Sequence, residues 1–279
     1  MEDLVKTINI DFKKMKGSIC RMKIKIMDKE EKRKIKLETK NISVKFEDKK
    51  IIEDISVRLY ENELVCILGL SGVGKTTLFN VIAGLIFPDK GKVEMNGTDI
   101  TGKSGNISYM LQKDLLLPFK TVIDNVALPL VIKGEKKKTA REEAEKYFRQ
   151  FGLEGTERKY PSQLSGGMRQ RAALLRTYLF SGETALLDEP FSALDAITKH
   201  KMHLWYLDIM KQIKMSTLFI THDIDEAVIL SDRIYILAGS PGKITAEIDI
   251  DMDRFGDNEE LELSEKFLEY KREILKYLK

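Results

Sequence analysis

Residues 164–171 read Leu-Ser-Gly-Gly-Met-Arg-Gln-Arg, and they lie between two other stretches that are typical of nucleotide-handling sites. Residues 69–76 read Gly-Leu-Ser-Gly-Val-Gly-Lys-Thr, and residues 186–190 read Leu-Leu-Asp-Glu-Pro. A glycine loop alone indicates only that a nucleotide binds. The order of the three stretches predicts an α/β protein that clamps its nucleotide between two protein surfaces.

The first stretch has the spacing of a phosphate-binding loop. The wholly apolar residues 64–68 before it indicate a strand that is buried on both faces of a parallel sheet. A helix is expected to begin near Lys75, which should reach the β- and γ-phosphates, and the Thr76 hydroxyl should bind Mg²⁺. A glycine-rich turn of an unrelated α/β protein is the alternative. The residues expected to contact the nucleotide here are Gly69, Leu70, Ser71, Gly72, Val73, Gly74, Lys75, Thr76 and Thr77.

Two acidic residues follow a second apolar run, residues 184–187. A carboxylate at the C-terminal end of a buried strand faces the crevice where open α/β sheets bind ligands. We therefore expect Asp188 to hold Mg²⁺, directly or through water. Glu189, on the opposite side of an extended chain, should polarise an attacking water. A solvated acidic pair is the alternative, which the Ser-Ala-Leu-Asp sequence at 192–195 disfavours.

A third apolar run, residues 217–220, ends just before His222. An imidazole at this edge of the sheet could hydrogen-bond the γ-phosphate. The alternative is a structural histidine, which is the commoner role of a lone histidine. His200 and His203 fall in a helical stretch after Asp195, and we expect both at the surface.

The Leu-Ser-Gly-Gly stretch has a physical rationale of its own. Ser165 can cap a helix that begins near Gly166, and this leaves backbone N–H groups without intrahelical partners. Such a positively polarised helix end attracts phosphate.

Together the motifs resemble the nucleotide-binding subunit of an ABC transporter. The resemblance implies an α/β fold: a P-loop NTPase cassette with a RecA-like core, an antiparallel β subdomain and an inserted helical subdomain. It identifies residues 164–167 as the family signature, residues 192–195 as the D-loop and His222 as the switch histidine. Ser165, Gly166 and Gly167 would meet the γ-phosphate of an ATP held by a second copy of the chain, so two copies would share two ATP molecules.

The resemblance also implies roles for two residues outside these motifs. Gln112 matches the glutamine that contacts the Mg²⁺ site and links it to the surface facing the membrane partner. Phe46 matches the aromatic residue that stacks on adenine. The chain departs from many cassettes at Met168, where they have Gln, and Arg169 and Gln170 could substitute for the missing amide. The catalytic residues implied are Glu189, His222 and Gln112, and the Mg²⁺ ligands implied are Thr76, Gln112 and Asp188.

Four stretches, residues 116–126, 166–171, 193–198 and 240–244, narrow the resemblance to the ATPases of nitrate, sulfonate and taurine importers, whose relatives also serve pyrimidine precursors. The resemblance implies ATP hydrolysis coupled to import of a small solute. The expected partners are a transmembrane permease subunit and, indirectly, a solute-binding protein, with no nucleic acid. The chain should lie peripherally on the cytoplasmic side of the membrane. A soluble non-transport ABC ATPase is the alternative.

Length and composition fit one cassette. A chain of 279 residues with 43% hydrophobic residues can bury one α/β core, and its two cysteines fit no metal spacing. No apolar stretch approaches the roughly 20 residues that span a bilayer, and charged residues interrupt the N-terminus, which is unlike a secretory signal. The expected divisions are a basic extension at 1–36, a cassette at 37–248 with its helical subdomain at 113–163, and a tail at 249–279 with an amphipathic helix.

The extension and the inserted segment carry further expectations. Residues 1–36 contain 12 Lys and Arg against 6 Asp and Glu, whereas the whole chain has a net charge of only +3. A solvated arm is expected there; contact with lipid or nucleic acid and a later start at Met22 or Met27 are alternatives. Thr139 to Glu142 resembles a capping box that opens a helix, with Gly152 as its stop.

Overall fold

The computed structural model describes residues 33–252 and 262–278. The chain divides into two units, residues 1–34 and 35–279. Most of the predicted basic extension therefore lies outside the described residues, as do Leu261 and Lys279. The first strand begins at Ile35, so the predicted extension and this strand overlap by two residues.

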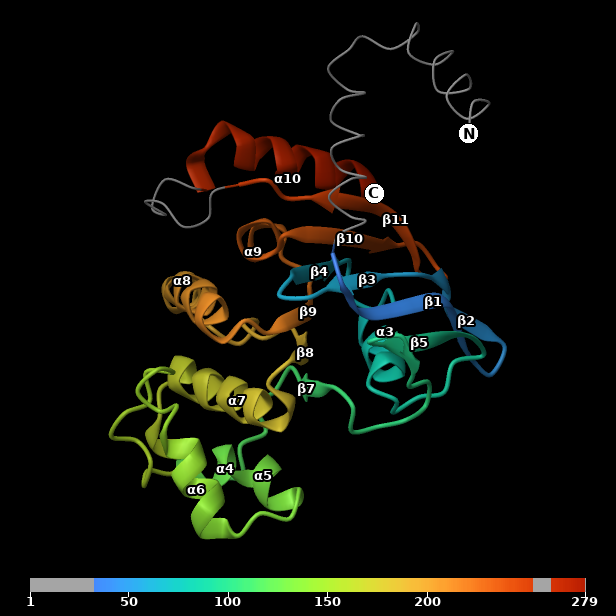
Figure 1. Cartoon of the computed structure of the whole chain (residues 1–279). Coiled ribbons are helices and arrows are strands. Elements are labelled where there is room, and N and C mark those ends of the chain that lie inside the picture. The colour runs from blue at the N-terminus through green and yellow to red at the C-terminus, as the bar shows by residue number, and fades with distance from the viewer. Residues whose placement is uncertain (1–32, 253–261, 279) are drawn as a thin grey trace, which may run out of the picture. The chain divides into compact units, whose positions relative to one another are not determined.

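A six-stranded sheet forms the centre of the second unit, in the order β11-β10-β4-β9-β8-β7 (Figure 1). Five neighbouring strands run parallel: β4 (Leu64–Leu68), β7 (Ser108–Met110), β8 (Thr184–Asp188), β9 (Ser216–Thr221) and β10 (Arg233–Ala238). β11 (Lys243–Asp249) is antiparallel to β10. Every residue of β4, β8 and β9 is buried, because these apolar runs are covered on both faces. The register places Leu68 beside Thr221 and Asp188 beside Ile220, so these strand ends meet at one edge.

A second, antiparallel sheet has the order β2-β1-β5-β6, with β3 also paired to β1. Its strands are β1 (Ile35–Phe46), β2 (Lys49–Ile55), β3 (Arg58–Tyr60), β5 (Lys90–Met95) and β6 (Thr98–Asp99). Alternation along β4 divides the core. Val65 and Ile67 join the hydrophobic cluster that this sheet shares with α3, whereas Cys66 and Leu68 join the cluster of the remaining helices.

Helices flank the central sheet, as Figure 1 shows. The helices outside the segment between β7 and α7 are α3 (Lys75–Ile82), α7 (Gly166–Ser181), α8 (Ala196–Ile213), α9 (Ile224–Leu230) and α10 (Glu265–Tyr277). The segment between β7 and α7 contains α4 (Val122–Val126), α5 (Leu128–Ile132), α6 (Lys137–Glu145) and the 3₁₀ turn η1 (Pro161–Gln163). Among the described residues, every helix is too short or too polar to cross a bilayer. The mixed sheets and the inserted helices confirm the predicted fold class.

Two local expectations in the helices were wrong. α6 begins at Lys137 with Lys136 at its N-cap, so Thr139 lies inside the helix and caps nothing. The helix starts earlier because Gly134, with φ of 97°, ends the turn after α5 and Lys137 forms an ion pair with Asp124 at 3.3 Å. Gly152 does adopt a left-handed φ of 64°, but α6 has already ended at Glu145, and the glycine ends the following turns instead.

The C-terminal helix α10 is amphipathic, as expected, and its buried face is narrow. Phe267 and Ile274 are buried and join the main hydrophobic cluster. Leu263 shares the helical spacing of these two residues in the sequence, but it is 78% exposed because it precedes the first helical turn, where Ser264 is the N-cap.

Candidate active site

The phosphate-binding loop leaves β4 and enters α3 as the sequence predicted. Gly72 and Gly74 adopt φ values of 82° and 108°, which favour glycine. A Cβ at Gly69 would lie 2.4 Å from the Leu237 carbonyl oxygen, so the loop approaches β10 too closely for a side chain. These constraints favour glycine at positions 69, 72 and 74 in the loop that leads into α3.

Lys75 is the cation of this loop, and its side chain is only 6% exposed. Its Nζ donates to the carbonyl oxygens of Gly69 at 2.8 Å and Leu70 at 3.0 Å. Burial lowers the pKa of Lys75, and the carboxylates of Glu189 and Asp188 oppose that shift. An ammonium bound to neutral carbonyls can transfer its hydrogen bonds to the more strongly accepting oxygens of a phosphate.

Asp188 lies at the end of β8, beside the loop. Thr76 Oγ1 donates to Asp188 Oδ2 at 3.3 Å, and the Tyr109 hydroxyl donates to the same oxygen at 3.4 Å. Burial raises the pKa of Asp188, with the Glu189 charge acting in the same direction. A nearby cation would favour the charged carboxylate. The pair of Thr76 and Asp188 oxygens is also the donor type that Mg²⁺ prefers, with phosphate and water completing its shell.

Tyr109 is a member of this site that sequence reasoning missed. It lies on β7, three residues before Gln112, and its ring packs edge-on against Phe79 of α3 at 6.0 Å. Burial raises its pKa, so the phenol stays protonated and donates. The available signal was its place on a short strand directly before the glutamine.

Glu189 brings together three predicted residues from separate segments. Gln112 Nε2 donates to Glu189 Oε2 at 3.1 Å, and His222 Nδ1 lies 3.1 Å from Glu189 Oε1. Lys75 Nζ is 4.0 Å from the same Oε1. Gln112, Glu189, Ser192 and His222 line one open cleft. The carboxylate is thus placed at the strand edge, beside both the phosphate loop and a histidine.

The backbone at Glu189 differs from the sequence expectation. Its φ is 45°, a left-handed value that is rare for glutamate, so the chain is not extended there. The turn follows from pairing at the end of β8, where the Glu189 N–H donates to the Ile220 carbonyl at 3.0 Å. Such a conformation costs of order 1 kcal/mol and is typical of functional positions.

The signature segment starts α7 as expected. Ser165 is the N-cap, and its Oγ accepts from the Met168 N–H at 3.3 Å. A Cβ added at Gly166 would lie 3.3 Å from Leu194 Cδ2, so the start of α7 packs closely on the 192–195 segment. Among the described residues, no hydrogen bond or ion pair joins residues 165–167 to residues 69–77.

Of the remaining residues singled out in the sequence, His203 lies differently from expectation. Phe46 is 48% exposed at the end of β1, paired with Lys49, and the hollow beside the phosphate loop is lined by Lys49 and Ile51 but not by Phe46. His203 is buried, packs edge-on against Phe191 at 5.1 Å, and has its pKa lowered by burial to about 4. The surface expectation for His203 was wrong because that face of α8 packs into the core. His200 is half-buried, with Nδ1 3.4 Å from a Glu262 carboxylate oxygen.

The chain is similar to known proteins in both sequence and fold. The ABC transporter family profile matches residues 52–192. An uncharacterized ABC transporter ATP-binding protein of Methanocaldococcus jannaschii is 41% identical over 90% of this chain and 94% of its own length. The formylaminopyrimidine import ATP-binding protein ThiZ of Halalkalibacterium halodurans is 46% identical, covering 81% of this chain and 87% of that protein.

Solved structures show the same fold. The dimeric cassette MJ0796 in a post-hydrolysis state, bound to ADP and Pi, is 27% identical with a TM-score of 0.65, covering 77% of this chain and 99% of that one. The cassette CbiO1 of Clostridium perfringens, part of an ABC transporter complex, reaches a TM-score of 0.72 at 20% identity, covering 86% and 100% of the two chains. The chain therefore belongs to the ABC transporter family, as one of its ATP-binding and ATP-hydrolysing cassettes.

Proposed function

We propose that this cassette drives import of a small solute through a separate membrane permease. Relatives that are 36–46% identical include import ATP-binding proteins named for formylaminopyrimidine, aliphatic sulfonates, nitrate and taurine. We infer a solute of that range, either a small oxyanion or amino sulfonate or a pyrimidine precursor. The observation that carries the proposal is the convergence of Gln112, Glu189 and His222 beside the phosphate loop.

The phosphate loop would bind the triphosphate of ATP. Its backbone N–H groups and the start of α3 supply positive potential, and Lys75 would exchange its two carbonyl partners for β- and γ-phosphate oxygens. Phe46 would stack on adenine at the half-exposed end of β1. Thr76 and Asp188, with Gln112 nearby, would hold Mg²⁺, which neutralises charge on the β- and γ-phosphates when bound.

Hydrolysis would use the carboxylate of Glu189 as the group that polarises water. Its contacts with Gln112 and His222 fix it at the strand edge, and neither contact blocks a water molecule from a second carboxylate lone pair. His222 would donate a hydrogen bond to the γ-phosphate, and Lys75 would stabilise charge on the transferred phosphoryl group.

A second copy of the chain would complete each site. The dimeric relative bound to ADP and Pi supports this arrangement. Within the described part of the chain, residues 165–167 form no hydrogen bond or ion pair with the phosphate loop, which supports it too, because the capped end of α7 can then meet a phosphate held elsewhere. We infer a dimer that closes on ATP and reopens after hydrolysis.

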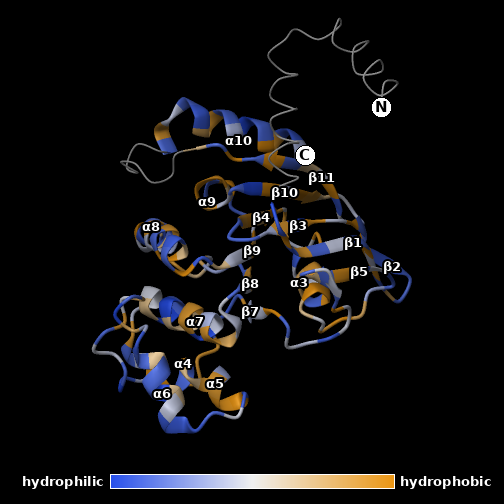
Figure 2. Cartoon of the chain, viewed as in Figure 1, coloured by the Kyte–Doolittle hydropathy of each residue, from blue (hydrophilic) through white to orange (hydrophobic). Residues whose placement is uncertain are grey.

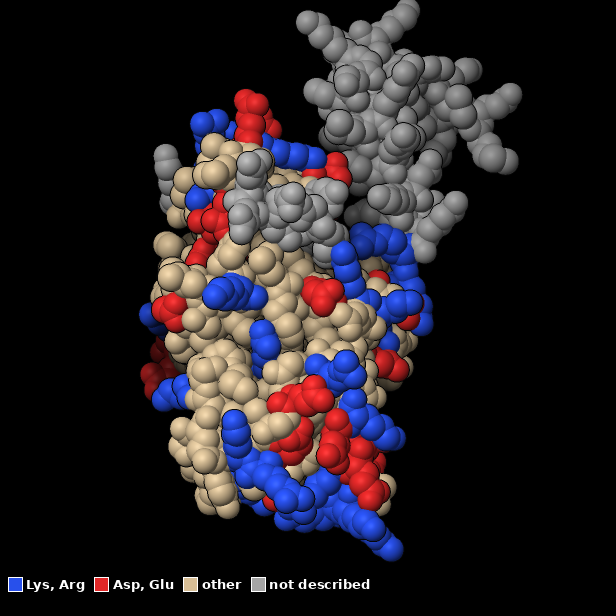
Figure 3. All heavy atoms as spheres, turned by 90° about the vertical axis from the view of Figure 1, so that its left-hand side faces the viewer, with Lys and Arg blue, Asp and Glu red and all other residues tan. Residues whose placement is uncertain are grey.

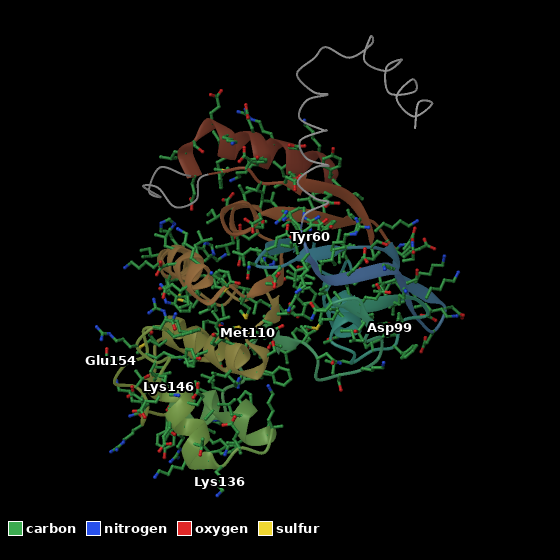
Figure 4. All side chains as sticks on the ribbon, in the orientation of Figure 1. Tyr60, Asp99, Met110, Lys136, Lys146 and Glu154 are labelled. Atoms are coloured by element: carbon green, nitrogen blue, oxygen red, sulfur yellow. The ribbon has the colours of Figure 1, made fainter. Side chains whose placement is uncertain are left out.

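The permease would bind the apolar surface that follows Gln112. Met110, labelled in Figure 4, is the last residue of β7, and the chain then runs into the segment with the inserted helices. α5 is strongly hydrophobic in Figure 2. Exposed lysines follow it in the chain, among them Lys136, which is labelled in Figure 4. Figure 3 shows Lys and Arg gathered at this end of the face turned to the viewer. The exposed apolar residues here are Leu111, Leu115, Phe119, Val131 and Ile132.

An apolar patch with a charged rim is typical of a protein interface. We therefore place the chain peripherally, on the cytoplasmic side of the membrane, through the permease, with a solute-binding protein as an indirect partner.

Co-purification tests the transport role. A tagged chain extracted from detergent-solubilised membranes should retain a multi-spanning permease. Phe119→Asp with Ile132→Asp, two side chains that are each 73% exposed, should lose it because two charges enter the apolar surface. Leu263→Asp, 78% exposed but outside this surface, is the matched control and should keep the permease. A parent chain recovered only as a soluble ATPase would favour a non-transport cassette instead.

A further inference from the structure

The loop that carries His222 is fixed by side-chain hydrogen bonds on both sides. The Thr221 hydroxyl donates to Glu226 Oε2 at 2.7 Å and accepts from the Asp223 N–H at 3.0 Å. Asp223 Oδ1 accepts from the N–H groups of Asp225 and Glu226 at 3.0 and 3.3 Å, and so caps α9. These contacts bind the loop to α9.

The second carboxylate oxygen of Asp223 binds a different helix. Lys199 Nζ donates to Asp223 Oδ2 at 2.8 Å. Lys199 lies in the first turn of α8, where its backbone N–H donates to the Asp195 carbonyl at 2.8 Å. The two side chains are 24% and 31% exposed. Burial alone lowers the pKa of Lys199, but its hydrogen bond with Asp223 and the Asp223 charge raise it overall, so the pair stays ionised.

The same helix is connected to Glu189 by its preceding segment. The Ser192 N–H and hydroxyl donate to the Glu189 carbonyl at 3.2 and 3.0 Å, and α8 begins four residues later at Ala196. Lys199 therefore closes a ring of contacts. The ring runs from Glu189 through residues 192–195 and α8 to Asp223, and returns through His222 to the Glu189 carboxylate.

We propose that Lys199 is a positioning residue for ATP hydrolysis, whose ion pair with Asp223 keeps His222 aligned with Glu189 and with residues 192–195. This inference rests on the proposed function, because it concerns the same site. Lys199 does not line the cleft that contains Glu189, so it acts through Asp223 rather than on ATP. A partly exposed ion pair contributes little to folding stability, so the effect of the pair falls mainly on turnover.

Steady-state ATP hydrolysis by the full chain tests this role. Lys199→Met should lower kcat by roughly ten- to a hundredfold, because a small displacement of a catalytic group has effects of that size. The KM for ATP should stay within about twofold of the parent value, since the phosphate loop is untouched. Lys199→Arg should restore most of the activity. Lys138→Met, which removes the exposed ion pair with Glu142 on α6, is the matched control and should keep the parent kcat.

A double-mutant cycle separates positioning from general damage. Asp223→Asn keeps an oxygen that can cap α9 but removes the charge that binds Lys199. Lys199→Met should then cause no further loss in the Asp223→Asn background. Three results would overturn the proposal. They are a Lys199→Met variant that keeps the parent kcat, a Lys199→Met variant whose ATP affinity falls by the same factor as its kcat, and a double mutant in which the two losses of kcat add. If the parent itself hydrolyses no ATP, the proposed function fails, which is a distinguishable result.

Discussion

At the scale of single residues, the site depends on where strands end. The sequence predicted that Asp188, Glu189 and His222 lie at one edge of a parallel sheet, because apolar runs precede each of them, and the register of β8 and β9 places them there. The contribution of Tyr109 and the left-handed turn at Glu189 could not be predicted, because both depend on how neighbouring strands pair.

Ser165→Arg should separate ATP binding from hydrolysis. The arginine would block the capped end of α7, which we assign to the nucleotide of the partner chain, while Lys75 and the phosphate loop of the same chain stay intact. We expect hydrolysis to be abolished and ATP affinity to remain near that of the parent, measured by titration with a fluorescent ATP analogue. Lys75→Ala is the comparison that should lose affinity. An equal loss of affinity in Ser165→Arg would place the signature in the same chain's site.

At the scale of elements, strands that are buried on both faces were easier to predict than the buried face of a helix. β4, β8 and β9 are continuous apolar runs and are buried along their whole length. The start of α6 and the burial of His203 were missed because a glycine turn and the packing of one face of α8 decide them. Apolar residues lie around much of α8, so the sequence of this helix does not show which of its faces meets the core.

The packing of α10 predicts that alanine substitutions at neighbouring positions of this helix lower the free energy of unfolding by unequal amounts. Ile274 is fully buried in the main hydrophobic cluster, whereas its neighbour Leu275 is 48% exposed. Ile274→Ala should lower the free energy of unfolding by about 2–5 kcal/mol, because it removes buried methyl groups and leaves a cavity. Leu275→Ala should change it by about 0.5 kcal/mol or less. Urea titration of both variants provides the measurement, and equal losses would mean that α10 does not pack as described.

At the scale of the whole molecule, the motifs lie in the unit that begins at Ile35. Lys36 is buried and forms an ion pair with Glu183, so a truncation that spares the fold has to end before β1. Deleting residues 2–34 should leave ATP hydrolysis within about twofold of the parent, since no site residue lies there.

Membrane retention of the truncated chain tests whether the basic extension contributes to binding. Attraction of a basic segment to anionic lipid is screened over about 8 Å at physiological ionic strength. Release of the full and the truncated chain from membranes should follow superimposable curves across a salt series. Release of the truncated chain at lower salt would show that residues 2–34 bind anionic lipid, contrary to this expectation.

The central claim is that two copies of the chain enclose ATP and that Glu189 then drives its hydrolysis. Glu189→Gln keeps the shape of the side chain and one acceptor oxygen beside Gln112 and His222 but removes the charge that polarises water. The most direct measurement is light scattering of this variant with Mg-ATP, alongside its hydrolysis rate. We predict a particle of twice the 32.0 kDa chain mass and almost no hydrolysis. A variant that stays monomeric with Mg-ATP, or that hydrolyses ATP at the parent rate, would contradict the account.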